Sequence, residues 1–389
     1  MPHTSPKNNF IPLSRPSFGE EEKKAVLNCL ESGWVTTGPQ TAKFEEKLCV
    51  YFGGRHTLAL SSNTAGLYLA LKALGIGPGD EVITSPLTFA ATANVIEWSG
   101  AQTVFCDVDP RTRNLDPGLV QKAITHRTKA IIPIHFAGLA ADMAHFFALA
   151  KQHNLRIIED AAHAFGATYA DKKIGTFGDI QVFSFHANKN LSSCEGGAIV
   201  TDDKALLEKI RSLSFHGLST SAWERAQGKK NVYDITQPGL KFNMMDLQAT
   251  LGLCQLKKID HMNHMRKHLV SRYVKALTDS PYLEMPPTSE GRSWNFFAPL
   301  VRTDRLGINR DALATKLKEK GVGTTVHYRP LHLFSYYRKA YPALKEGTFP
   351  HAENIGSTTL SLPLWPHLAE QEQDIVIEKL IKTLEENAL

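Results

Sequence analysis

Short apolar runs alternate with helical patterns along the first 250 residues, and this alternation limits the fold more than any other feature of the sequence. Runs of strand length lie at 57–60, 81–85, 103–108, 130–135, 155–159 and 182–185. Helical patterns lie between several of them, at 67–74, 117–124 and 143–153. Such alternation indicates a mainly parallel sheet with helices on its faces. Functional side chains of these sheets gather beyond the carboxyl ends of the strands.

Two of these runs lead to residues with complementary chemistry. The run 155–159 is followed by Asp160 and then His163, and the run 182–185 leads to Lys189. A lone lysine is more often a solvated surface charge. A carboxylate and a lysine at two strand ends are, however, the pair that pyridoxal 5'-phosphate (PLP) requires. The amine forms a Schiff base with the cofactor aldehyde, and the carboxylate keeps the ring nitrogen protonated. The pair predicts a PLP site with Lys189 and Asp160 as its catalytic residues.

Two other carboxylates compete with Asp160 for this role. Asp107 and Asp109 lie at or just past the end of another strand-like run. Neither stands in the Glu-Asp-Ala-Ala-His context of Asp160, and Asp109-Pro110 is typical of a turn.

The segment 61–66, Ser-Ser-Asn-Thr-Ala-Gly, separates a predicted strand from a buried helix. Unpaired amides and the helix dipole make a helix N-terminus an anion site. The segment is therefore the first candidate for the cofactor phosphate. Ordinary N-capping by Ser62 or Asn63 is the alternative explanation. Beside a lysine–carboxylate pair, the phosphate interpretation is favoured.

Several motifs resemble the DegT/DnrJ/EryC1/StrS family of sugar-nucleotide aminotransferases. They are Ile-Glu-Asp-Ala-Ala-His at 158–163, Ser-Phe-His-Ala-Asn-Lys-Asn at 184–190 and Glu-Gly-Gly at 195–197. The resemblance runs from about residue 11 to near the C-terminus. It implies an α/β protein with PLP-dependent transferase fold type I, the aspartate aminotransferase-like fold. That fold has a large, mainly parallel-sheet domain and a smaller C-terminal α+β domain.

The last third of the chain has a pattern of its own. A long amphipathic helix is expected over 247–274. Short strands at 296–301 and 324–327 then alternate with helices at 310–320 and 371–384, which predicts a compact α+β domain. We therefore expect three parts: a disordered N-terminus at 1–10, a large PLP-binding α/β domain at 11–250, and a small C-terminal α+β domain at 251–389.

The resemblance implies cofactor contacts residue by residue. The implied contacts are Thr64 and Ala65 in the phosphate loop, Phe89 stacked on the pyridine ring, His163 at the ring or its phenolic oxygen, Ser184 at the phosphate, and Asn243 reaching the cofactor phosphate of the partner subunit. For three of these residues a structural role is the alternative: Phe89 as an ordinary core residue, Ser184 as a strand-edge serine, and His163 as a structural histidine.

The resemblance also implies residues on the substrate side of the site. Thr37 lies in a loop near the sugar, or in a simple turn between helices. His327 and Arg329 follow a predicted strand, and Arg329 is either a bidentate ligand of a carboxylate or phosphate or a surface residue. Lys229 and Lys230 are candidates to clamp a nucleotide diphosphate, although a solvated charge run is the more usual explanation.

The implied reaction moves an amino group from L-glutamate, which leaves as 2-oxoglutarate, to the 4-keto position of a nucleotide-linked sugar. The product would serve cell-surface polysaccharide, lipopolysaccharide or related glycan biosynthesis. Segments 31–39 and 215–218 are similar to the family branch that acts on UDP-linked 4-amino-4-deoxy-L-arabinose. A shared site implies a homodimer. Alternatives are an aminohydroxybenzoate-type enzyme acting on a non-sugar ring and a non-catalytic PLP-fold protein.

Composition and sequence patterns limit the kinds of partner that the protein can bind and the cellular compartment in which it works. A hydrophobic content of 42% and a charged content of 21% are ordinary for globular proteins. The net charge of +5 is spread along the chain, so no nucleic-acid partner is expected. No apolar run approaches a membrane span, and the N-terminus lacks a signal core, which predicts a cytoplasmic protein. The five cysteines lack CxxC spacing and the 16 histidines lack HExxH, which argues against a metallohydrolase.

Overall fold

The computed structural model describes residues 10–219, 226–228 and 232–389. At its centre is a seven-stranded sheet in the order β1-β9-β8-β5-β4-β2-β3. β9 runs antiparallel to both of its neighbours, whereas the other neighbouring pairs are parallel, so the mainly parallel sheet is confirmed. The strands of this sheet are β1 (His56–Leu60), β2 (Glu81–Thr84), β3 (Gln102–Phe105), β4 (Thr128–Ile132), β5 (Arg156–Asp160), β8 (Ile180–Ser184) and β9 (Gly197–Thr201).

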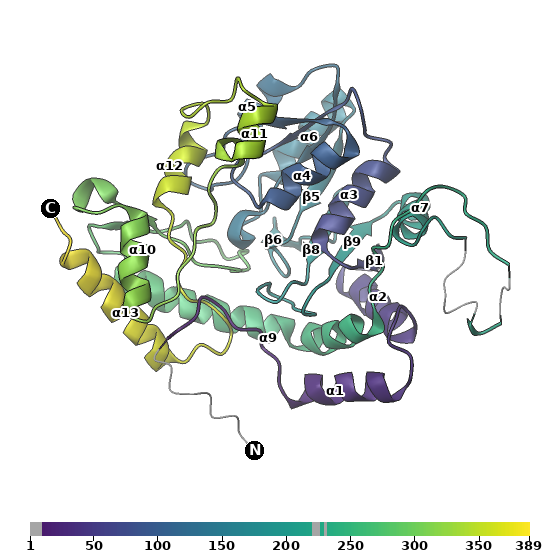
Figure 1. Cartoon of the computed structure of the whole chain (residues 1–389), viewed down its shortest axis with the longest axis horizontal. Helices are drawn as coiled ribbons and strands as arrows, with labels where there is room; N and C mark the ends of the chain where they lie inside the picture. The colour runs from purple at the N-terminus through teal and green to yellow at the C-terminus, as the bar shows by residue number, and fades with distance from the viewer. Residues whose placement is uncertain (1–9, 220–225, 229–231) are drawn as a thin grey trace.

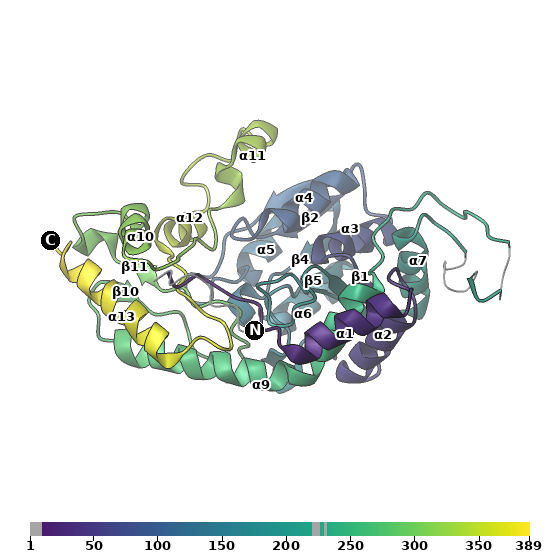
Figure 2. The same cartoon turned by 60° about the horizontal axis from the view of Figure 1, so that its bottom comes forward.

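Helices cover both faces of the sheet, as Figures 1 and 2 show. Several begin at predictable caps: the carboxylates of Asp116, Asp142 and Asp203 accept first-turn amides of α5, α6 and α7. No helix in the described ranges is long and apolar enough to span a bilayer. In the large domain the helices are α1 (Glu20–Glu31), α2 (Pro39–Tyr51), α3 (Asn63–Ala73), α4 (Ala90–Ser99), α5 (Pro117–Ala123), η1 (Phe136–Gly138), α6 (Met143–His153), α7 (Lys204–Ser214) and α9 (Asp246–Leu277).

The remaining elements are short strands and the helices of the C-terminal part. β6 (Thr168–Tyr169) and β7 (Lys172–Lys173) form a separate two-stranded antiparallel sheet. The C-terminal elements are β10 (Leu283–Glu284), β11 (Leu300–Val301), η2 (Thr303–Arg305), α10 (Arg310–Glu319), η3 (Leu331–Leu333), α11 (Ser335–Ala340), α12 (Pro350–Thr358) and α13 (Glu370–Glu385).

Alternate residues of each strand pack on opposite faces of the sheet. Val82 and Ile158 belong to a core with α3, α4 and α7. Their neighbours Ile83 and Ile157 belong to a core with α5 and α6, and Phe183 packs with α2 and the first half of α9. Burial of one such side chain contributes about 1.5 to 3 kcal/mol. This alternation decides which helices can supply partners to each residue at a strand end.

The long helix α9 joins two hydrophobic cores and lies along both halves of the molecule (Figures 1 and 2). Ala249 and Met262 pack in the large-domain core. Leu269 and Tyr273 pack with α10 and α13 in a second core, which also includes Ile11 from the N-terminal segment. The domain boundary after residue 250 stays a prediction, and it falls inside this continuous helix.

Three local predictions need correction or lie beyond the structure. No strand forms at 324–327, where Thr325 makes a single bridge to Ser361, and the strand predicted for 296–301 is present only at its end, as β11. The ring of His327 stacks on Phe296, with ring centres 4.1 Å apart. The disordered N-terminus predicted for 1–10 falls outside the described residues except for Phe10.

The carboxylate of Asp246, at the start of α9, holds the loop that leads into α2. Its Oδ1 accepts the Gly38 amide at 2.8 Å, the Thr41 amide at 2.9 Å and the Thr41 hydroxyl at 2.7 Å. Because the group is buried, we expect Asp246→Ala to lower the free energy of unfolding by about 3 kcal/mol, measured by chemical denaturation. Asp260→Ala, at an exposed position of the same helix, should change it by less than about 0.5 kcal/mol. Equal effects of the two substitutions would contradict this role.

Candidate active site

Asp160 is the last residue of β5, and its buried carboxylate accepts three hydrogen bonds. Oδ1 accepts the Asn63 Nδ2 amide and the Ala162 backbone amide, each at 3.2 Å. Oδ2 accepts the Thr92 hydroxyl at 2.7 Å. Like Ile158, Asp160 faces the α3 and α4 side of the sheet, which is why these helices supply the partners. Three donors stabilise the ionised carboxylate and fix its direction.

Lys189 lies half-buried in the loop after β8. Burial lowers the pKa of its amine to about 8, while the nearby Asp160 carboxylate opposes that shift by raising the pKa. The structure therefore brings the predicted lysine and the predicted carboxylate into one electrostatic environment. An amine with this pKa is partly neutral near neutral pH, as a nucleophile requires.

The Lys189 loop is held in place by hydrogen bonds from distant segments. The Asn190 amide donates 2.8 Å hydrogen bonds to Asn263 Oδ1 and Ser293 Oγ. Its oxygen accepts from Asn295 Nδ2 at 2.9 Å, and Arg266 Nη1 lies 3.5 Å from its backbone carbonyl. The sequence analysis did not identify these residues. They fix the backbone from which Lys189 projects.

The pKa of Lys189 gives a direct prediction for cofactor uptake. Because an amine attacks an aldehyde only when neutral, the rate of PLP uptake by the cofactor-free protein should rise with pH and level off above about pH 8. Asp160→Asn should lower this midpoint, since the carboxylate raises the pKa. Stopped-flow absorbance measures both rates, with Lys189→Arg as the control that takes up no cofactor covalently. A wild-type midpoint near about 10.4, the value for a solvated lysine, would contradict the prediction.

His163 and two aromatic residues line the same region. The imidazole is buried, its Nε2 lies 3.0 Å from Tyr328 Oη, and its Nδ1 has no partner among the described residues. Burial and the charge of Lys189 hold the pKa of His163 well below its usual value, so the ring is neutral. Phe89 is 62% exposed although it is a large apolar residue, and its ring centre lies 6.3 Å from that of Tyr328. An exposed ring beside a polar site suits stacking on a flat cofactor.

The predicted phosphate residues lie at one edge of the sheet. Ser184 ends β8, and Thr64 and Ala65 lie in the first turn of α3. Gly197 is the cross-strand partner of Ser184, and a Cβ at this glycine would lie only 2.5 Å from the carbonyl carbon of Ser62. The glycine therefore permits the close approach that places the α3 N-terminus beside Ser184.

The capping alternative holds in part at this helix. Ser62 Oγ accepts the Ala65 amide at 3.1 Å and so caps α3. Asn63 does not cap, because its side-chain amide donates to the Val182 carbonyl at 2.8 Å as well as to the carboxylate at the end of β5. The Ala65 amide is thus already paired within the protein. The phosphate contacts of Thr64 and Ala65 stay predictions.

Thr37 and Asn243 form a pair at a separate cavity. Asn243 Nδ2 donates to Thr37 Oγ1, which in turn donates to the Met244 carbonyl at 2.5 Å. Both residues line a cavity of about 410 Å³, and neither Lys189 nor Asp160 is among its described lining residues. Within one chain, the structure therefore pairs these two predicted residues but does not place them with the lysine–carboxylate pair.

His327 and Arg329 diverge although they are two residues apart. Burial, with a further effect of Lys189, lowers the pKa of His327 to about 3, so its ring is neutral and near the lysine. The Arg329 side chain is exposed, and its guanidinium lies over the ring of Phe334 at 5.0 Å. Of the two, His327 is the one that the structure brings towards the site.

The other charged residues that the sequence singled out are placed elsewhere or lie outside the described chain. Asp107 Oδ1 accepts the Ala352 amide at 2.8 Å and so anchors the start of α12, and Asp109 binds amides of its own turn. Lys229 and Lys230 are outside the described residues, so a diphosphate clamp stays a prediction. The described ranges hold no group of three metal-ligating side chains, which lends the metallohydrolase alternative no support.

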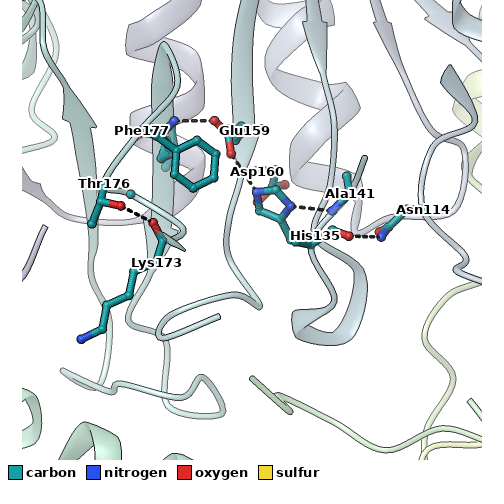
Figure 3. A network of polar contacts seen from close by, with 12 residues as sticks. Asn114, His135, Ala141, Glu159, Asp160, Lys173, Thr176 and Phe177 are labelled. Atoms are coloured by element: carbon teal, nitrogen blue, oxygen red, sulfur yellow. Dashed lines mark hydrogen bonds and ion pairs between the residues drawn. The ribbon is translucent and has the colours of Figure 1, made fainter. Parts of the chain in front are cut away.

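A buried network on the opposite face of β5 ties the strand ends together. Figure 3 shows the His135 ring between Glu159 and the amide of Ala141. Since His135 Nδ1 accepts that amide at 3.1 Å, its Nε2–H donates to Glu159 Oε2 at 3.0 Å. Glu159 also accepts from Gln181 on β8, and the His135 amide donates to the Asp160 carbonyl at 3.2 Å. The network connects the end of β5, where Asp160 lies, to the segment that follows β4.

The residues present fit pyridoxal phosphate on structural grounds. A primary amine with a lowered pKa lies near a buried carboxylate that accepts three hydrogen bonds. An unpartnered buried imidazole nitrogen and an exposed aromatic ring stand in the same region. A helix N-terminus lies at the adjoining strand ends, where a phosphate would bind.

Comparisons with known proteins agree with this geometry. The DegT/DnrJ/EryC1/StrS aminotransferase family matches residues 16–381. The chain is 46% identical over 376 residues to the spore coat polysaccharide biosynthesis protein SpsC of Bacillus subtilis, with 96% of each chain covered. The putative sugar aminotransferase Spr1654 of Streptococcus pneumoniae, in its PMP form, superimposes with a TM-score of 0.90 at 32% identity and covers 97% of this chain and 99% of its own.

A second solved structure gives the same result. Helicobacter pylori PseC, an aminotransferase involved in the biosynthesis of pseudoaminic acid, has a TM-score of 0.90 at 30% identity, with 97% and 100% of the two chains covered. The chain therefore belongs to the DegT/DnrJ/EryC1/StrS aminotransferase family and is a PLP-dependent aminotransferase of fold type I.

Proposed function

We propose that this enzyme transfers the amino group of L-glutamate to the 4-keto group of a nucleotide-linked sugar, in the synthesis of a cell-surface glycan. The observation that carries the proposal is the Lys189 amine in the field of the buried Asp160 carboxylate. The similarity to SpsC, a protein of polysaccharide biosynthesis, and to the sugar aminotransferases supports the sugar acceptor. The glutamate donor and the 4-keto position rest on the motif resemblance.

The residues of the site take distinct roles in this proposal. Bound PLP supplies an aldehyde for the amine and a protonated ring that withdraws electrons from the reacting carbon. Asp160, held in one direction by Asn63 and Thr92, would be the carboxylate partner of the ring nitrogen. The Lys189 amine anchors the cofactor and, when released, takes and returns a proton at its Nζ. The buried neutral ring of His163 offers a hydrogen bond without adding charge.

A product assay tests the acceptor. The enzyme is incubated with PLP, ¹⁵N-labelled L-glutamate and, in separate reactions, a UDP-, GDP- or dTDP-linked 4-keto sugar or a ring ketone that is not a sugar. The expected result is a labelled amino sugar nucleotide in at least one reaction, detected by mass spectrometry, and none with Lys189→Ala. Turnover of glutamate without label in any keto sugar, but with label in a non-sugar ring ketone, would replace the sugar acceptor with the aminohydroxybenzoate-type alternative.

We propose in addition that the enzyme works as a homodimer in which Asn243 serves the partner's site. The support is the position of Asn243 at a cavity that its own Lys189 does not line. A mixture of Lys189→Ala and Asn243→Ala subunits, dissociated and reassembled together, should regain about one quarter of the wild-type rate. Half of randomly assorted dimers are mixed, and each would hold one intact site. No gain above the separate variants would show that Asn243 acts within its own subunit or not at all.

A further inference from the structure

One contact reaches from the C-terminal part of the chain to the site. Tyr328 Oη lies 3.0 Å from His163 Nε2, and the two rings are nearly parallel, at 15° with centres 6.1 Å apart. Phe136 and Phe296 pack edge-on against the tyrosine ring, with interplanar angles of 86° and 85°. These aromatic contacts do not involve the hydroxyl. Removing the hydroxyl alone should therefore leave the ring in place.

Counting donors and acceptors decides which atom of this pair carries which proton. If Tyr328 donates to Nε2, the only unpaired group is the Nδ1–H of His163. If His163 Nε2–H donates instead, two groups are left unpaired, the tyrosine hydroxyl hydrogen and the Nδ1 lone pair. Nδ1 is buried without a partner in the described chain, and within the described ranges Tyr328 Oη makes its hydrogen bond to His163 alone. The first arrangement leaves fewer polar groups unpaired and is therefore favoured.

Burial and the neighbouring titratable groups keep both His163 and Tyr328 neutral. Burial, followed by Lys189, His327 and His135, holds the pKa of His163 well below its usual value. Burial and the Asp160 carboxylate raise the pKa of the tyrosine hydroxyl, so it keeps its proton. A neutral imidazole has one N–H, and its tautomer is set by what the other nitrogen accepts.

We propose that Tyr328 is a positioning residue that fixes the tautomer of His163 and so presents its Nδ1–H to an anionic oxygen in the site. The inference rests on the proposed function, because the matching acceptor is an oxygen of bound PLP or of the substrate. Tyr328 acts through His163 and needs no contact with the reacting atoms. A buried N–H without a partner in the protein is what such an oxygen would satisfy.

The tautomer can be measured directly in the PLP-loaded enzyme. Uniform ¹⁵N-histidine labelling and long-range ¹H–¹⁵N spectra report which ring nitrogen carries the proton, and His163→Gln identifies the signal. We expect Nδ1 of His163 to be protonated in the wild type. Protonation at Nε2 in the wild type would overturn the proposal, and this result does not depend on the folding of any variant.

A second readout tests the role of the hydroxyl. In Tyr328→Phe, the pH midpoint of the visible absorption of the loaded enzyme should move upward by about 0.5 to 1 unit, because one hydrogen bond to an anionic oxygen is weakened. Tyr273→Phe, which loses a buried hydroxyl contact to the Pro363 carbonyl in the second core, should leave the midpoint unchanged. An unmoved midpoint in Tyr328→Phe would overturn the inference. A wild-type enzyme that takes up no PLP would instead overturn the proposed function.

Discussion

Lys189→Ala is expected to lower the rate of amino transfer from L-glutamate by at least about 10⁴-fold. The substitution removes both the amine that anchors the cofactor and the base that moves the proton. In the structure, the Asp160 carboxylate raises the pKa of this amine against the larger lowering effect of burial, so the two groups share one electrostatic environment. Single-turnover absorbance with L-glutamate measures the loss. The fold should be retained, because Asn190 and its neighbours hold the loop through backbone and amide contacts.

Two comparisons separate a chemical effect from a structural one. Lys72→Ala, at an exposed position in the last turn of α3, should leave the rate unchanged. A small primary amine such as ethylamine, added to Lys189→Ala, should restore part of the rate by taking the place of the missing base. A Lys189→Ala enzyme with more than about one tenth of the wild-type rate would refute the role of Lys189.

Asp160→Asn is expected to lower the rate by about 10²- to 10⁴-fold, while PLP still binds. The amide is close to the shape of the carboxylate but has no charge to hold the ring nitrogen protonated. Its carboxamide oxygen can still accept the Asn63 and Ala162 amides, and its NH₂ group can donate to the Thr92 hydroxyl oxygen in the place of Oδ2. The rate of the glutamate half-reaction and the cofactor content of the variant are the quantities to measure.

Thr92 provides a graded test of the same site. Thr92→Val removes the 2.7 Å hydrogen bond to Oδ2 but leaves the charge of Asp160, so we expect a loss of only about tenfold. Thr92→Ser keeps the hydroxyl and should retain most of the rate. If Asp160→Asn cost no more than Thr92→Val, the charge of Asp160 would not be what the reaction uses.

The sequence identified the two central residues because each lies at or shortly after the end of a recognisable apolar strand. Asp160 is the last residue of β5, and Lys189 lies five residues after Ser184, the last residue of β8. Parallel strands place their carboxyl ends at one edge of the sheet, so two local patterns are enough to predict a shared site. Asp107 also lies at a strand end, and what separates it from Asp160 in the sequence is the Glu-Asp-Ala-Ala-His context, which it lacks. In the structure its carboxylate anchors the start of α12.

The partners of these residues left no local pattern to find. Asn63 and Thr92 lie 97 and 68 residues from Asp160, and Tyr328 lies 165 residues from His163. Only the packing of α3, α4 and the C-terminal segment on the sheet brings them together. An asparagine beside a serine in a helix N-terminus is equally consistent with capping, which hid the role of Asn63.

Some elements were missed because their sequences lack start signals. α4 begins after Phe89, which provides no side-chain cap, and the sequence analysis saw no helix there. β9 opens on Gly197, a residue that weakens strand patterns, and it is the one antiparallel strand in the main sheet. In both cases tertiary packing rather than local propensity decides the structure.

The most direct test of the central claim is the visible absorption of the PLP-loaded enzyme before and after addition of L-glutamate. We predict a yellow enzyme whose band bleaches on addition of L-glutamate and returns on addition of a keto-sugar nucleotide acceptor. Lys189→Ala should lack the yellow band of the wild type, and addition of L-glutamate should therefore bleach nothing in this variant. A wild-type enzyme that stays colourless with PLP, or whose band L-glutamate leaves unchanged, would contradict the assignment of Lys189 and Asp160 as the centre of an aminotransferase site.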